Sequence, residues 1–104
     1  MEKILILAAA IAFSTVAHAA DPAAGREKAK VCAACHGENG VSQAADFPKL
    51  AGQYDDYLTR ALNDYKSGAR KNPIMAGQVA NLKQEDIADL AAYFSSQQAL
   101  VTKY

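Results

Sequence analysis

The sequence predicts an all-α domain, and three observations support this fold class. Segments 53–67 and 84–96 place apolar side chains at spacings of three and four, the period of a helix with one buried face. Segment 23–34 is rich in alanine, lysine, glutamate and arginine, which are good helix formers. No stretch shows the alternation typical of a half-buried strand. At 104 residues and zero formal charge, one domain is expected, and the basic excess of a nucleic-acid-binding protein is missing.

The first 19 residues have the pattern of a cleaved secretory signal peptide. Lys3 precedes an apolar run over residues 4–13, and Ala17-His18-Ala19 supplies the small-residue cleavage pattern. Because the run is shorter than the ~20 residues that span a bilayer, stable membrane insertion is not expected. We predict cleavage after Ala19, with Ala20 as the alternative, a domain over residues 20–104, and export to the periplasm.

The first helix of that domain has a recognisable start. Asp21 is a candidate N-cap, and Pro22 suits the first helical position. Gly25 interrupts the helix formers and has two possible explanations, a frayed first turn or a close crossing with another helix.

Two segments read as loops, and two further helices follow them. Residues 37–49 lack periodicity, and Gly68 is a stop signal for the helix predicted over 53–67. Residues 69–80 are expected to form a loop that carries Met75. The last helix, over 84–96, would start at Lys83, which is a poor N-cap.

The predicted core is small. Removal of residues 1–19 leaves 85 residues, of which only 22 are apolar residues larger than alanine. Domains of this size often need a staple, so another group is expected to complete the core.

Cys32 and Cys35 are the only cysteines, and His36 follows them directly. A disulfide would close a very short loop and stabilise weakly. A thioredoxin-like pair would follow a strand, and tetrahedral zinc would need four ligands. Cys-x-x-Cys-His is instead the attachment signature of a c-type haem. The sequence therefore predicts one covalent haem c, with thioethers at Cys32 and Cys35 and His36 as an axial iron ligand.

The second axial ligand follows by elimination. His18 and Met1 lie in the predicted leader, so His36 and Met75 are the only histidine and methionine of the remaining chain. Methionine in a core is more often a gap-filling side chain, but in a single-haem protein Met75 is the expected sixth ligand. Four aromatic residues could pack on the porphyrin or form ordinary core: Phe47, Tyr54, Tyr57 and Tyr65. The basic cluster of Lys66, Arg70 and Lys71 reads as a solvated face or as a docking site.

These motifs, in this order, resemble the class I cytochromes c, and most closely the small bacterial c4, c5 and c553 types. The resemblance rests on four segments that cover nearly the whole predicted domain: Cys-Ala-Ala-Cys-His-Gly at 32–37, Phe-Pro-Lys-Leu-Ala-Gly-Gln-Tyr at 47–54, Pro-Ile-Met-Ala-Gly at 73–77 and Asp-Ile-Ala-Asp-Leu-Ala-Ala-Tyr-Phe at 86–94. It implies about four short helices wrapped around one covalently bound haem. It also implies a crossing of the first and last helices near Gly25, and a hydrogen bond from the His36 ring to the Pro48 carbonyl.

The expected function is that of a soluble periplasmic single-electron carrier, and no catalysis is required of it. Partners would be redox proteins that dock transiently on a monomer through small interfaces. One alternative is a haem-bearing subunit permanently associated with a periplasmic dehydrogenase or terminal oxidase. Another is a ligand-binding or peroxidatic haem protein with an open sixth site, against which Met75 argues.

Overall fold

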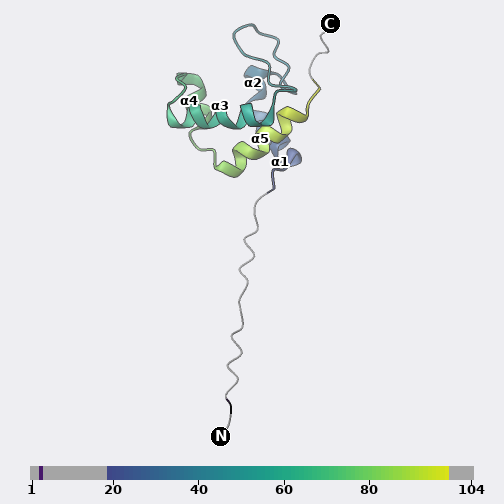
Figure 1. Cartoon of the computed structure of the whole chain (residues 1–104). Helices are drawn as coiled ribbons and strands as arrows, with labels where there is room; N and C mark the ends of the chain where they lie inside the picture. The colour runs from purple at the N-terminus through teal and green to yellow at the C-terminus, as the bar shows by residue number, and fades with distance from the viewer. Residues whose placement is uncertain (1–2, 4–18, 99–104) are drawn as a thin grey trace.

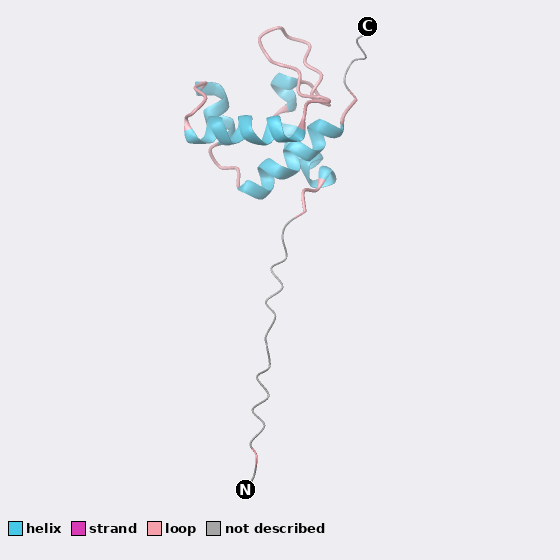
Figure 2. Cartoon of the chain, viewed as in Figure 1, coloured by secondary structure: helices cyan, strands magenta, loops and turns pink. Residues whose placement is uncertain are grey.

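The structure is a computed structural model that describes residue 3 and residues 19–98. Five α-helices and one 3-10 turn form this part of the chain, and no strand occurs in it (Figure 2). The elements are α1 (Pro22–Lys28), the 3-10 turn η1 (Ala29–Val31), α2 (Ala33–His36), α3 (Asp55–Ser67), α4 (Pro73–Val79) and α5 (Gln84–Ser96). The all-α prediction is confirmed. The predicted leader over residues 1–19 lies outside the described residues except for Lys3 and Ala19.

The crossing of α1 and α5 is the main packing contact of the fold (Figure 1). Gly25 is buried there, and a Cβ at this position would lie 2.6 Å from the carbonyl carbon of Asp89 and 2.7 Å from the Cβ of Tyr93. Only a residue without a side chain allows the two backbones to come this close. The close-crossing explanation of Gly25 is therefore confirmed, and the frayed-turn explanation is wrong.

The predicted helix over 23–34 is broken into three short elements. It starts as expected, since Pro22 is the first residue of α1 and the Asp21 side chain accepts a hydrogen bond of 2.9 Å from the Ala23 N–H. After Lys28 the chain tightens into η1, where the Cys32 N–H donates to the Ala29 carbonyl at 2.9 Å. A 3-10 turn has about three residues per turn instead of about 3.6. The side chains of α2 therefore point in different directions around the axis from those of a continuous α-helix.

A small apolar core lies where α5 packs against α1 and α3. Its size agrees with the shortage of large apolar residues in the sequence. The buried apolar residues are Ala29, Ala51, Leu58, Val79, Ile87, Leu90, Ala91, Tyr93 and Phe94.

The prediction of a loop over 69–80 is wrong for residues 73–79, which form α4. Proline disfavours helix before it but fits the first helical position, which Pro73 occupies. Asn72 supplies the cap, because its side-chain oxygen accepts hydrogen bonds from the Ile74 and Met75 N–H groups at 3.0 and 3.2 Å. The start of α5 is stabilised although Lys83 is a poor N-cap, because the Asp86 carboxylate accepts a hydrogen bond of 2.8 Å from the Lys83 backbone N–H.

No helix in residues 19–98 combines the length and apolar character needed to cross a membrane.

Candidate haem-attachment site

His36 is the last residue of α2 and is 7% exposed. Its Nδ1 lies 2.8 Å from the carbonyl oxygen of Pro48. A carbonyl can only accept, so Nδ1 carries a proton and donates it, and in the neutral ring the lone pair is then on Nε2. The Phe47 ring meets the imidazole edge-on, with 6.2 Å between the ring centroids. The Phe47 ring and the Pro48 carbonyl therefore set the orientation of His36, and the carbonyl sets its tautomer, leaving Nε2 able to bind a metal.

A closed loop brings Pro48 to His36. The Gly40 carbonyl accepts hydrogen bonds from the N–H groups of Leu50 and Ala51 at 2.8 and 3.1 Å, and Gly52 donates to the Phe94 carbonyl at 2.9 Å. Figure 2 shows the resulting loop between α2 and α3. It is anchored on α5 at its base, so Pro48 is held without secondary structure of its own.

Gly37 makes the turn that ends α2 directly after His36. Its φ of 84° lies in the left-handed region, and a Cβ there would lie 2.7 Å from the carbonyl carbon of Val41. A glycine is needed at this point because a side chain would meet both the unfavourable φ and the Val41 backbone.

Cys32 is the N-cap residue of α2 and Cys35 lies within this helix, and both are half-buried free thiols. The N–H groups of Cys35 and His36 both donate to the Cys32 carbonyl, at 3.2 and 2.9 Å, so the five-residue motif is one compact helical turn. Burial raises the pKa of the Cys32 thiol, and the neighbouring Cys35 raises it further. Among the described residues no group of three or more His, Cys, Asp or Glu side chains could hold a metal ion.

Met75 lies on a different element from the other predicted site residues. It is the third residue of α4, is half-buried, and α4 packs chiefly against α3. The structure thus brings Cys32, Cys35, His36 and Pro48 together on and around α2, and it places Met75 on a separate capped helix.

The sequence did not predict an ion-paired cluster that lies at the α1–α5 crossing. Asp89 is fully buried, and Lys28 Nζ lies 2.6 Å from Asp89 Oδ2 and 2.7 Å from Asp86 Oδ1. The Asp21 backbone N–H also donates to Asp89 Oδ1 at 2.8 Å. No sequence signal marked this aspartate, because position 89 lies off the stripe of Ile87, Leu90, Ala91 and Phe94 on the last helix.

The basic cluster predicted at Lys66, Arg70 and Lys71 has mostly internal partners. Lys66 donates to the Leu82 carbonyl, and the Arg70 guanidinium lies 4.8 Å from the centroid of the Tyr65 ring. Lys66 thus links α3 to the segment between α4 and α5, Arg70 lies against α3, and all three basic residues are exposed.

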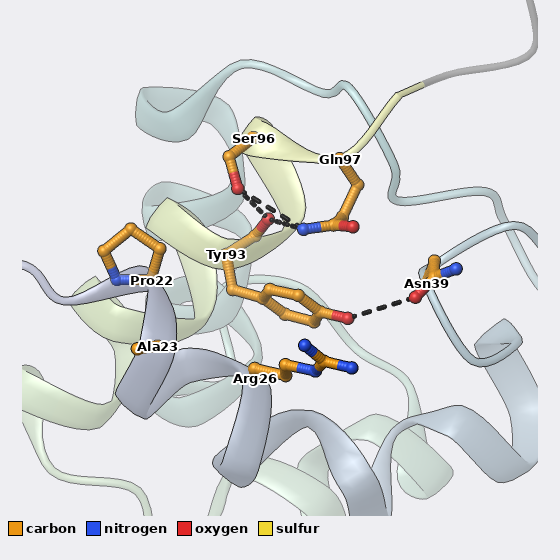
Figure 3. Close-up of a pocket in the computed structure, with 7 residues that line it drawn as sticks. All are labelled: Pro22, Ala23, Arg26, Asn39, Tyr93, Ser96 and Gln97. Atoms are coloured by element: carbon orange, nitrogen blue, oxygen red, sulfur yellow. Dashed lines mark hydrogen bonds between the residues drawn. The ribbon is translucent and has the colours of Figure 1, made fainter.

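A pocket beside the α1–α5 crossing is separate from the predicted site residues. Figure 3 shows the Tyr93 hydroxyl directed toward Asn39, to which it donates at 3.4 Å. The lining residues are Pro22, Ala23, Arg26, Asn39, Tyr93, Ser96 and Gln97. None of them belongs to the Cys-x-x-Cys-His turn or to α4.

The helical fold and the Cys-x-x-Cys-His turn with its fixed histidine define a class of protein, the haem-binding cytochromes. Comparison with known families agrees, because the Cytochrome c family model matches residues 22–98. The chain therefore belongs to the cytochrome c family.

Individual relatives narrow the comparison. The chain is 48% identical to a cytochrome c4 of Pseudomonas aeruginosa over 97% of its own length and 51% of that protein. It is 43% identical to cytochrome c-554(548) of Halomonas halodenitrificans over 77% of its own length and 100% of that protein. The crystal structure of reduced recombinant cytochrome c4 from Pseudomonas stutzeri superposes with a TM-score of 0.76 at 46% identity, covering 80% of this chain and 48% of that one. The chain thus spans about half the length of the cytochromes c4 it matches.

The residues present fit a haem. Two thiols and one imidazole share a single helical turn, and the imidazole is held in the tautomer that leaves Nε2 for iron. Large apolar side chains next to the motifs in the sequence are exposed, and an apolar group that removed them from water would stabilise the protein. They are Val31 at 69%, Tyr54 at 82% and Ile74 at 61% exposure.

Proposed function

We propose that this protein is a periplasmic carrier of single electrons that holds one haem c and is not an enzyme. The observation that carries the proposal is the hydrogen bond between His36 Nδ1 and the Pro48 carbonyl, next to two free thiols on the same turn. When bound, the haem supplies an iron that changes oxidation state by one electron.

Each residue of the motif has a distinct task. Cys32 and Cys35 would attach the haem through two thioethers, and His36 Nε2 would ligate the iron. The Pro48 carbonyl keeps the imidazole from rotating and makes Nε2 more basic, as a hydrogen-bonded partner does for metal-ligating histidines generally. Rigid placement of the ligand limits the rearrangement that accompanies each change of oxidation state.

Met75 would be the sixth ligand. A thioether favours the reduced iron and raises the reduction potential relative to a second histidine, and it blocks access of small exogenous ligands. Chemistry at an open sixth site is not part of this function. The protein would therefore work by docking transiently with redox partners, as a monomer, and releasing them unchanged.

The test uses the exported holoprotein. Methionine bound to ferric haem gives a weak long-wavelength charge-transfer band, which we expect in the wild type and not in Met75→Ala. Met75→His should remain six-coordinate, lack the band and have a lower reduction potential. A matched control is Gln78→Ala, which alters an exposed polar side chain on α4 and should keep the band. A wild-type holoprotein without the band would overturn the assignment of Met75.

Size-exclusion of native extract separates the free carrier from the permanently bound subunit. A carrier elutes near the mass of one domain. Elution only together with a dehydrogenase or an oxidase would contradict the proposed monomer and favour the alternative.

A further inference from the structure

We propose that Asn72 is the positioning residue for the sixth ligand, and that its side chain controls how readily Met75 leaves the iron. The inference rests on the proposed function, since it takes Met75 as the ligand. It assigns a role to a residue outside the haem-binding motif, through its contact with the backbone of Met75.

The geometry is direct. Asn72 Oδ1 accepts the N–H of Ile74 at 3.0 Å and the N–H of Met75 at 3.2 Å, and the Asn72 carbonyl accepts the N–H of Ala76 at 2.8 Å. One residue therefore holds the backbone immediately before Met75, Met75 itself and the residue after it. Pro73 adds a fixed φ at the first helical position.

α4 packs on α3 and buries Val79 at its C-terminal end, but the turn that carries Met75 has little other local support. α4 has only seven residues, and helices of that length are marginal without packing or caps. Gly77 lies inside it, which further lowers its helix propensity. Two N–H groups would lose their partner without the Asn72 side chain, so the cap is a large share of what keeps α4 folded.

The segment that leads into the cap is anchored on α3. The Arg70 N–H donates to the Asp64 carbonyl at 3.0 Å, and its guanidinium lies over the Tyr65 ring. The chain is thus fixed on α3 up to residue 70. The next fixed point is Asn72, whose side chain holds the backbone of Met75. Loss of the cap would release α4 without disturbing α3.

Gly77 provides an opposing variant. Two helical positions separate it from Met75, which is a rotation of about 200° and places it on the far side of α4. A Cβ at Gly77 would meet no protein atom within 4 Å, so Gly77→Ala should fit and strengthen the helix. Asn72→Ala and Gly77→Ala therefore move the stability of α4 in opposite directions without touching the ligand.

The experiment titrates the ferric holoprotein with imidazole, which binds the iron when Met75 has dissociated. Asn72→Ala should raise the apparent affinity for imidazole about fivefold, because the ligand-free state becomes more populated. Asn72→Ser keeps an uncharged cap and should return the affinity to nearly the wild-type value. Gly77→Ala should lower the affinity about fivefold, and the double variant Asn72→Ala/Gly77→Ala should lie near the wild type.

Asp21→Ala is the matched control, because it removes the same kind of cap from α1. It should lower the unfolding temperature and leave the imidazole affinity unchanged. Equal imidazole affinities for the wild type and Asn72→Ala would overturn the inference, as would an Asn72→Ser variant that behaves like Asn72→Ala. A wild type that lacks the methionine charge-transfer band would instead contradict the proposed function, so the two failures are distinguishable.

Discussion

Lys28 on α1 and Asp89 on α5 form an ion pair of 2.6 Å across the helix crossing, 61 residues apart in the chain. The carboxylate is fully buried, and its second oxygen accepts the Asp21 N–H at 2.8 Å. One side chain of α5 therefore holds both ends of α1, and α1 leads directly into the turn that carries the cysteines.

Replacement of the buried carboxylate should be costly. In Asp89→Ala, the Asp21 N–H loses its partner at the crossing and Lys28 keeps only Asp86, so we expect the free energy of unfolding to fall by about 3 kcal/mol. Urea unfolding of the holoprotein measures this. Asp64→Ala is the control, because its ion pair with Arg60 is loose at 3.9 Å and exposed, and less than about 0.5 kcal/mol should be lost. Equal effects of the two substitutions would contradict the importance of the buried pair.

Stability should fall in acid because of Asp86. A hydrogen bond from Lys28, and then one from the Lys83 backbone, lower the pKa of Asp86 below its ordinary value of 3.8. A group with a lowered folded pKa stabilises the fold above its unfolded pKa, and this contribution disappears as the pH falls through the folded pKa. Urea midpoints at pH 6 and pH 3 should therefore differ more for the wild type than for Asp86→Asn. An unchanged difference in the variant would assign the acid sensitivity to other groups.

Gly25→Ala should disrupt the helix crossing. The added Cβ would lie 2.6 Å from the Asp89 carbonyl carbon, which is backbone and cannot move aside. We expect a loss of at least about 3 kcal/mol, seen as a lowered thermal midpoint in far-UV circular dichroism. Gly77→Ala is the contrasting substitution, and its midpoint should not fall. A Gly25→Ala variant as stable as the wild type would show that α1 and α5 can separate without cost.

Covalent attachment should depend on both cysteines. Intact mass of the exported protein should show one haem per chain in the wild type, and no covalently bound haem in Cys32→Ala/Cys35→Ala. The single variants should each keep at most one thioether, so acid–acetone extraction should remove only the haem that is attached through neither cysteine. His36→Ala tests a different property, because it leaves both thiols and removes an iron ligand. Covalent haem in the double variant would contradict the proposed attachment site.

Local signals in the sequence determined much of this protein. The five-residue motif at 32–36 predicts the attachment chemistry, and the bounds of α5 followed from apolar periodicity and acidic residues in its first turn. Asp21 and Pro22 marked the start of α1 for the same reason, since capping and helix propensity act within a few residues. The α4 helix has an equally local signal in Asn72-Pro73, because asparagine is a good N-cap and proline fits the first helical position, although proline also disfavours helix before it.

Tertiary structure decided what depends on residues far apart in the chain. Gly25 had two explanations until the backbone of Asp89 was found against it, and the buried Asp89 found its partners 61 and 68 residues away. The break between α1 and α2 was likewise not evident from helix formers alone. Helix propensity indicates how readily a residue becomes helical, but it does not indicate where packing requires an α-helix to tighten into a 3-10 turn. Sequence thus specified the chemistry of each segment, whereas packing across the α1–α5 crossing and the closed loop at Gly40 decided how those segments meet.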